Sequence, residues 1–286
     1  MRRLELEARA KINLTLDLLY KRSDGYHEVE MVMQQVELSD IFTFTEQPGV
    51  IELTGSDKTL SWGKDNLIFK AVQLLQPFRP GAGVKITVEK RIPVGAGLAG
   101  GSSDAAQTLI ALNRLWGLEL STAELCRLGA ELGSDVPFCI AGGTALAQGR
   151  GERLTPLPPA PLLWVVLAKP KDLALSTAAV YAAVQEEHLQ TDYTPGMVEA
   201  LHDGDAEKIV SNLGNALEKV VLPYYPQVAY LKKFASSQSG TVALMSGSGP
   251  TVFVLLSEYA AAKELFFCLK RFGYETWLTR IYKITG

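Results

Sequence analysis

Residues 93–105, Pro-Val-Gly-Ala-Gly-Leu-Ala-Gly-Gly-Ser-Ser-Asp-Ala, constrain the fold of this chain more than any other segment. Four glycines and two adjacent serines lie between a predicted strand at residues 83–89 and a predicted helix at residues 103–115. Glycine permits tight turns and close approach of the backbone to a ligand. The first turn of a helix adds unpaired N–H groups and a positive dipole end. The segment therefore predicts a phosphate cradle, whose serines cap the helix or bind an oxygen of phosphate or of a hydrated metal.

Two better-known phosphate motifs fit this segment poorly. A Walker loop needs lysine before the hydroxyl residue, and Gly101 stands there. The dinucleotide fingerprint G-x-G-x-x-G fits Gly95, Gly97 and Gly100, but no glycine-rich strand opening occurs near the N-terminus. A capped helix after a flexible turn remains the plain structural alternative, although four glycines exceed what capping requires.

A strand and a turn near the start of the chain carry further polar side chains that could bind a ligand. Residues 10–16, Ala-Lys-Ile-Asn-Leu-Thr-Leu, alternate apolar and polar side chains and predict a strand. Lys11, Asn13 and Thr15 would share one face of that strand. Residues 21–27, Lys-Arg-Ser-Asp-Gly-Tyr-His, follow as a polar turn that ends in two side chains suited to ligand binding.

Two further segments complete the pattern. Residues 132–138, Leu-Gly-Ser-Asp-Val-Pro-Phe, place Asp135 in an otherwise apolar and glycine-rich stretch. A carboxylate there is costly to bury without partners. Residues 244–251, Leu-Met-Ser-Gly-Ser-Gly-Pro-Thr, form a second glycine–serine loop before an apolar strand.

Together these segments resemble the GHMP kinases, the family of galactokinase and of homoserine, mevalonate and phosphomevalonate kinases. The shared features are an early lysine-bearing strand, a P-x-x-x-G-L…S-S loop and a late G-S-G-P-T loop, in this order and over nearly the whole chain. The resemblance implies an α+β, two-domain GHMP kinase fold. Its N-terminal domain would be ribosomal-protein-S5-like and its C-terminal domain ferredoxin-like. The best boundary is the proline-rich stretch 154–161, giving domains at residues 1–156 and 157–286.

Details within the motifs indicate which members of the family the chain resembles most. Three residues separate Leu98 from Ser102, where mevalonate-type members commonly have one. The Ala-Lys-Ile-Asn-Leu strand and the Arg-Ser-Asp-Gly-Tyr-His turn are similar to members that act on a cytidylyl substrate. The resemblance implies ATP as phosphoryl donor, Mg²⁺ bound mainly through ATP, and a small-molecule cytidylyl substrate. Two alternatives are another GHMP kinase and a nucleotide-binding protein without catalysis, which the presence of both Lys11 and Asp135 disfavours.

The resemblance also assigns roles to single residues. Asp135 would be the catalytic base and Lys11 its partner, although a turn aspartate and a solvated edge lysine are the plain alternatives. Tyr26 would stack on the cytosine and His27 would bind its edge, with Tyr181 as a second aromatic wall or a core residue. Asn13 would orient the acceptor. The predicted ATP-binding residues are Pro93, Val94, Gly95, Ala96, Gly97, Leu98, Ala99, Gly100, Gly101, Ser102, Ser103 and Asn66, and the third loop contributes Gly247, Ser248 and Thr251.

Composition limits the class of protein. The chain has 286 residues, 47% hydrophobic and 21% charged, with a formal net charge of −3, as in a globular protein of one large or two ordinary domains. This charge gives no support for nucleic-acid binding. Cys126, Cys139 and Cys268 fit reduced thiols in a cytoplasmic protein, and the three histidines are too scattered for a metal site. No signal core or membrane-spanning run is evident, and no protein partner is implied.

Periodicity and breaker residues predict the remaining elements. Strands are expected at residues 4–10, 11–18, 28–38, 40–46, 50–54, 84–89, 142–148, 162–168, 241–245, 251–256 and 275–281. Helices are expected at residues 66–76, 103–115, 122–132, 176–185, 197–202, 206–213, 225–236 and 258–272.

Overall fold

Two long strands begin the chain in the computed structural model, which describes residues 2–283. Strand β1 (Arg3–Lys21) and strand β2 (His27–Pro48) are hydrogen-bonded neighbours in one sheet. The sequence predicted four shorter strands over the same residues. No glycine or proline interrupts either run, and the apolar alternation continues across the expected breaks, so each pair of predicted strands forms one element.

The contacts of the chain divide it into two compact units. Unit 1 contains the residues up to Ala10, Leu38–Pro93 and Ala99–Ala141. Unit 2 contains Lys11–Glu37, Val94–Leu98 and the residues from Gly142 onward. Each unit is therefore assembled from separate stretches of sequence, and the division at residue 156 stays a prediction.

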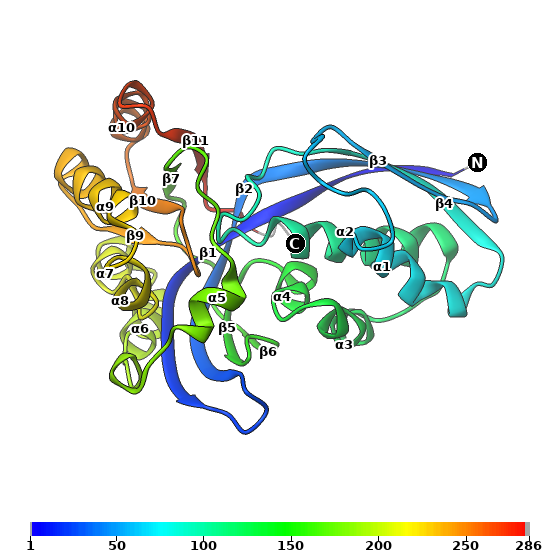
Figure 1. Cartoon of the computed structure of the whole chain (residues 1–286), viewed down its shortest axis with the longest axis horizontal. Coiled ribbons are helices and arrows are strands. Elements are labelled where there is room, and N and C mark those ends of the chain that lie inside the picture. The colour runs from blue at the N-terminus through cyan, green and yellow to red at the C-terminus, as the bar shows by residue number, and fades with distance from the viewer. Residues whose placement is uncertain (1, 284–286) are drawn as a thin grey trace. The chain divides into compact units, whose positions relative to one another are not determined.

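Unit 1 is a sheet with helices on one face (Figure 1). The second half of β2 pairs antiparallel with β4 (Ala82–Glu89), and β4 pairs parallel with β3 (Ile51–Gly55). Phe42 and Phe44 of β2 are fully buried, with ring centroids 5.3 Å apart. The covering helices are α1 (Leu67–Leu75), which continues into the short helix Gln76–Phe78, α2 (Gly100–Trp116), α3 (Thr122–Leu132) and α4 (Val136–Ala141).

Local signals explain where these helices begin and end. The side chain of Asn66 accepts from the N–H of Ile68 and caps α1. Ser121 and Glu124 form a reciprocal capping box at the start of α3. Helix α2 ends at Gly117, whose φ of 63° is the left-handed conformation that favours glycine.

Unit 2 contains two groups of strands. In the first, the early part of β2 pairs antiparallel with β5 (Thr144–Gly149), and β5 pairs with β6 (Arg153–Pro156). Strand β1 pairs parallel with the two-residue strand β8 (Gly214–Asn215). The sequence did not predict β6 or β8, because two to four residues carry no readable period.

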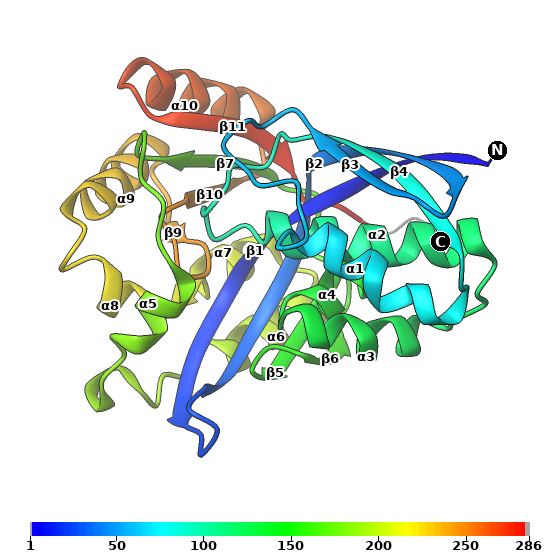
Figure 2. The same ribbon diagram turned by 45° about the vertical axis from the view of Figure 1, so that its right-hand side comes forward.

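The second group is a four-stranded antiparallel sheet in the order β11-β7-β10-β9. Its strands are β7 (Trp164–Lys169), β9 (Ala243–Met245), β10 (Val252–Leu256) and β11 (Glu275–Arg280). Helices α9 (Pro226–Ser239) and α10 (Tyr259–Arg271) pack on this sheet and on each other (Figure 2). This layer is the one expected from the predicted C-terminal strands and helices.

Short helices occupy the connections of unit 2. They are α5 (Thr177–Ala182), the single turn Glu186–His188, α6 (Thr194–Asp203), α7 (Ala206–Ser211) and α8 (Glu218–Val221). Helix α8 was not predicted, and α5 is shorter than the predicted helix. Over residues 2–283, no helix combines the length and apolar character needed to cross a bilayer.

Candidate active site

The first half of the glycine-rich loop is fixed by backbone contacts within unit 2. The N–H of Lys11 donates to the carbonyl of Leu98 at 3.1 Å, and Ser246 Oγ donates to the carbonyl of Gly97 at 3.0 Å. The N–H of Leu175 donates to the carbonyl of Gly95 at 3.3 Å. Three distant segments therefore hold Val94–Leu98 in one conformation, which is more than a flexible turn before a helix would need.

Two glycines of this loop are required by geometry. Gly97 has φ of 73°, and a Cβ atom there would lie 2.2 Å from the carbonyl oxygen of Ser246. Gly95 has φ of 61°, and its Cβ would lie 2.9 Å from the Cβ of Ala174. Neither space nor backbone conformation admits a side chain at Gly97 without displacing the loop.

The second half of the loop is already helical. The sequence predicted the helix from residue 103, but α2 begins at Gly100, after Ala99 in the left-handed conformation with φ of 56°. No side chain caps α2, so the two serines lie inside its first turn and do not cap it. The first N–H groups of the helix are therefore not capped by a side chain, and their role in binding phosphate stays a prediction.

The two serines differ in what their hydroxyls can do. Ser103 is buried, and its Oγ donates to the carbonyl of Arg9 at 2.6 Å, so its proton is already committed. Ser102 is half-buried, and its Oγ lies 3.9 Å from where a Cβ on Gly133 would stand. The structure therefore favours Ser102 over Ser103 as a donor to phosphate.

Asp135 lies in unit 1, in the turn between α3 and α4, two residues after Gly133. The N–H of Val136 donates to the carbonyl of Gly133, and the carbonyl of Asp135 accepts from Cys139 at the start of α4. The turn is tight because α4 packs on Gly129 of α3, where a Cβ would lie 2.8 Å from Val136 Cγ1. The backbone thus holds the half-buried Asp135 in a fixed position.

Lys11 is a buried lysine on β1, in unit 2. Its residue is 4% exposed, which excludes a solvated edge lysine, and its Nζ donates to Asn13 Oδ1 at 2.6 Å. The shared face predicted for Lys11 and Asn13 is confirmed by this contact. A Cβ on Gly247 would lie 3.4 Å from Lys11 Nζ, so the third loop approaches the ammonium through its glycine. Because Asp135 belongs to unit 1, its pairing with Lys11 stays a prediction.

The third loop is held by side chains that the sequence did not reveal. Asn215 Nδ2 donates to the carbonyls of Met245 and Gly247, at 2.7 and 2.8 Å. Ser248 Oγ lies 2.9 Å from Thr177 Oγ1. These contacts anchor the loop at Gly247 and Ser248. Asn215 stands in no recognisable motif, and only its place on β8 gives it this role.

Thr251 follows the cis peptide Gly249–Pro250 and is fully buried. Within the described residues, its hydroxyl has no hydrogen-bond partner. Its predicted part in substrate binding stays a prediction.

The three predicted base-binding residues gather in unit 2. The His27 and Tyr181 rings lie 5.9 Å apart between centroids, and His27 is 7% exposed. Burial, and then the charge of Lys21, lower the pKa of His27, so its ring is neutral at neutral pH. Tyr26 is 53% exposed, with the guanidinium of Arg150 at 4.9 Å from its ring centroid. An aromatic surface and a neutral imidazole suit a nucleobase.

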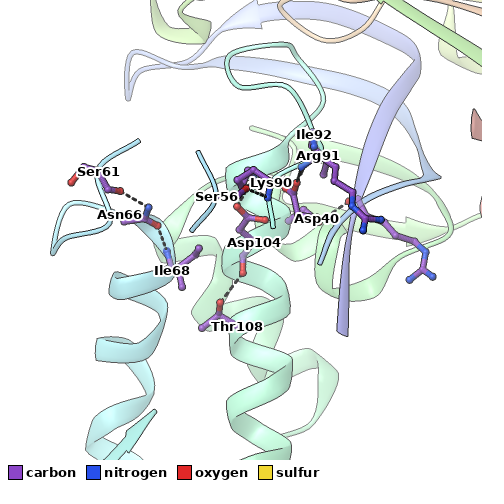
Figure 3. Close-up of polar contacts among 12 residues, drawn as sticks. Asp40, Ser56, Ser61, Asn66, Ile68, Lys90, Arg91, Ile92, Asp104 and Thr108 are labelled. Carbon is purple, nitrogen blue, oxygen red and sulfur yellow. Dashed lines mark hydrogen bonds and ion pairs between the residues drawn. The ribbon is translucent and has the colours of Figure 1, made fainter. Parts of the chain in front are cut away.

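The side chain of Asn66 stabilises the local structure of unit 1 (Figure 3). Besides capping α1, its Nδ2 donates to the carbonyl of Ser61 at 2.7 Å. Both ends of the side-chain amide are therefore engaged, and its predicted place near the adenine stays a prediction.

Comparison with known proteins places the chain in a family. Residues 66–143 match the family model described as the GHMP kinases N terminal domain, and residues 197–275 match GHMP kinases C terminal. The two matches together cover more than half of the chain. With its two-domain α+β architecture, the chain belongs to the GHMP kinases.

Full-length relatives and a solved structure point to one kind of enzyme within this family. The chain is 46% identical to a 4-diphosphocytidyl-2-C-methyl-D-erythritol kinase of Geobacillus thermodenitrificans strain NG80-2, over 98% of this chain and 97% of the relative. It is 45% identical to the kinase of the same name from Listeria innocua, over 97% and 96%. A crystal structure of 4-(cytidine 5'-diphospho)-2C-methyl-D-erythritol kinase superposes with a TM-score of 0.82 at 34% identity, covering 98% of this chain and all of that chain.

Proposed function

We propose that this chain transfers the γ-phosphoryl group of ATP to the 2-hydroxyl of 4-diphosphocytidyl-2-C-methyl-D-erythritol, in the non-mevalonate route to isoprenoid precursors. Its full-length relatives carry the name of that enzyme at 45–46% identity. The observation that carries the substrate assignment is the pairing of the buried His27 ring with the Tyr181 ring, 5.9 Å apart between centroids, which suits a nucleobase. Buried Lys11, whose Nζ donates to Asn13 Oδ1, is the polar group we assign to the acceptor.

We assign the separate parts of the reaction to different residues of the chain. The N–H groups at the start of α2 and the Ser102 hydroxyl hold the phosphates, while Lys11 stabilises negative charge on the acceptor oxygen. Asp135 orients the hydroxyl and accepts its proton. A positioned base contributes roughly 10²- to 10⁴-fold to such reactions. In a loose transition state the proton leaves late, so orientation is a large part of the role of Asp135.

The residues present fit a magnesium ion carried by ATP better than one held by a protein cage. Within residues 2–283, no group of three or more His, Cys, Asp or Glu side chains could hold a metal ion. Mg²⁺ prefers substrate phosphates, water and one or two oxygen ligands from the protein. The Ser102 hydroxyl is the protein ligand we assign to it. When bound, the ion neutralises phosphate charge.

The function is tested by following ADP release with the purified chain and a panel of acceptors. We expect turnover with the cytidylyl substrate and none with homoserine or mevalonate. Turnover of homoserine or mevalonate in its place would mean a different GHMP kinase. ATP binding without turnover of any acceptor would instead favour a nucleotide-binding protein without catalysis.

Base recognition gives a more specific prediction. Tyr26→Ala should weaken cytidylyl and uridylyl analogues alike, by about 1–3 kcal/mol, because every base has a face to stack. His27→Ala should mainly reduce the preference for cytosine over uracil, since the neutral imidazole can bind the base edge. The measurement is kcat/KM for both analogues with both variants.

Tyr224→Ala is the matched control for these variants. Tyr224 is 76% exposed in unit 2, and its removal should leave both analogues unaffected. An unchanged cytosine preference in His27→Ala would mean that another group distinguishes the two bases.

A further inference from the structure

A buried ionic cluster joins three elements of unit 1 (Figure 3). Lys90 directly follows β4, and its ammonium contacts the carboxyl groups of both Asp40 on β2 and Asp104 on α2. The Lys90–Asp104 contact is 2.6 Å. No side chain of the three is more than 6% exposed. Neither composition nor spacing indicated this cluster, because its members are far apart in the sequence.

The two carboxyl groups are not equally satisfied. Asp40 Oδ1 accepts from the N–H groups of Arg91 and Ile92, at 2.5 and 2.9 Å, and its other oxygen contacts Lys90. Asp104 Oδ2 contacts Lys90, but its Oδ1 is buried without a hydrogen-bond partner among the described residues. Of the two, Asp104 is therefore the group that loses most by carrying a negative charge.

The charges of the cluster do not balance if both carboxyl groups are ionised. Two carboxylates against one ammonium would leave a net negative charge in a buried site, and neighbouring carboxylates disfavour joint ionisation. Burial, together with the charge and contact of Asp40, outweighs the effect of Lys90 and raises the pKa of Asp104 to about 8. Burial would lower the pKa of Lys90, but Asp104 and Asp40 raise it, so Lys90 stays charged.

The cluster adjoins the start of α2. Lys90 Nζ lies 3.7 Å from the position that a Cβ on Gly100 would take, and Gly100 is the first residue of α2. Asp104 belongs to the next turn of the same helix. The cluster thus links the end of β4 to the helix terminus whose N–H groups we assign to the phosphates.

We propose that Asp40, Lys90 and Asp104 are positioning residues for the phosphate-binding turn of α2, and that they act with one carboxyl group protonated. The proposal rests on the ATP site proposed above. Ionisation of Asp104 would place an uncompensated negative charge behind the helix terminus. That charge would offset the positive potential of the helix N-terminus and repel the phosphates, so ATP affinity should fall at alkaline pH.

Two other charged groups near the cluster, Asp57 and Arg91, are held in their charged forms. Hydrogen bonds from Thr59, and further the charge of Lys90, lower the pKa of Asp57. Glu89 first, and also Asp40, raise the pKa of Arg91. Both side chains therefore keep their charges from pH 6 to pH 10, and Asp104 is the group expected to respond.

The test is Asp104→Asn, which has the shape of the protonated carboxyl group. Affinity for a non-hydrolysable ATP analogue is measured by equilibrium titration from pH 6.5 to 9.5, without the second substrate. At pH 7 the variant should match wild type within about twofold. Above pH 8 wild type should lose about tenfold in affinity, while the variant stays level, because only the carboxyl group can ionise.

Thermal unfolding gives an independent readout with a defined sign. The pKa of Asp104 is raised from 3.8 to about 8 on folding, so between these values the folded state binds the extra proton. Wild-type stability from this group therefore falls as pH rises through that window. The Tm of Asp104→Asn should exceed that of wild type by an amount that grows up to about pH 8 and then levels off.

Two further variants separate positioning from general damage. Glu89→Gln, which alters an exposed carboxylate beside the cluster, should keep the wild-type pH profile. Lys90→Met should lower ATP affinity more than tenfold while leaving affinity for the cytidylyl substrate within about twofold. If Lys90→Met does not fold, the pH dependence of ATP affinity in Asp104→Asn still tests the proposal.

The outcomes also distinguish this proposal from the proposed function. The proposal is overturned if Asp104→Asn loses more than about fivefold in affinity at pH 7, or if it shares the alkaline loss of wild type. Wild type that binds no ATP analogue would refute the proposed function and this positioning role together. The Tm comparison would then still report whether Asp104 is protonated.

Discussion

Asp135→Asn should lower kcat at least a hundredfold while leaving ATP affinity and the fold nearly unchanged. The amide keeps the shape of the side chain but cannot accept the proton, and a positioned base contributes roughly 10²- to 10⁴-fold. The backbone contacts that hold the turn, from Val136 to Gly133 and from Cys139 to Asp135, do not involve the replaced atoms. Steady-state ADP release and ATP-analogue titration measure the two quantities.

Glu131→Gln is the control, since this exposed carboxylate lies at the end of α3 four residues before Asp135. It should retain wild-type turnover. If Asp135→Asn keeps more than about a tenth of wild-type activity, Asp135 is not the base.

Lys11 can be tested against Asp135 in the same assay. Lys11→Met should lower kcat by a similar factor. The double variant should lose less kcat than the product of the two single losses, as is expected for residues that act as one unit. Losses that multiply would mean that Lys11 and Asp135 act independently. This cycle tests their pairing directly.

Gly97→Ala should remove measurable ATP binding. The new Cβ would stand 2.2 Å from the carbonyl oxygen of Ser246, at a residue whose φ is 73°. The loop must then move away from Ser246, and its backbone loses the conformation that approaches phosphate. Titration with an ATP analogue and a thermal unfolding curve show whether binding is lost in a folded protein.

Gly101→Ala is its matched control. A Cβ at Gly101 would make an ordinary contact, 3.6 Å from Leu67 Cδ1, inside helix α2. We expect ATP affinity within about threefold of wild type and a gain in stability of about 0.5–1 kcal/mol from the higher helix propensity of alanine. Equal effects of the two substitutions would refute the steric argument for Gly97.

These glycines show which features of the loop could be predicted from the sequence and which could not. All four glycines of residues 93–105 were among the predicted ATP-binding residues, and the sequence offered no means of telling which of them need a positive φ. The structure places positive φ at Gly95 and Gly97, and includes Gly100 and Gly101 in α2. A glycine-rich pattern predicts a close backbone approach, but the residue that makes it depends on contacts with a loop far along the chain.

Elements with a strong period were predicted well, and long-range side-chain contacts were not. The alternation in β1 correctly placed Lys11 and Asn13 on one face, and the apolar period of α1 gave its limits to within a residue. The burial of Lys11 and the roles of Asn215 and Asp104 were not evident, because each depends on partners brought together only by folding.

The pairing of β1 with β8 has a consequence for biosynthesis. Thr15 pairs with Gly214, so the first strand of unit 2 is synthesised long before its parallel neighbour leaves the ribosome. Contacts so distant in sequence slow folding and leave apolar strand edges exposed during translation. A fragment ending near residue 156 would contain β1 without β8, and we expect such a fragment to aggregate.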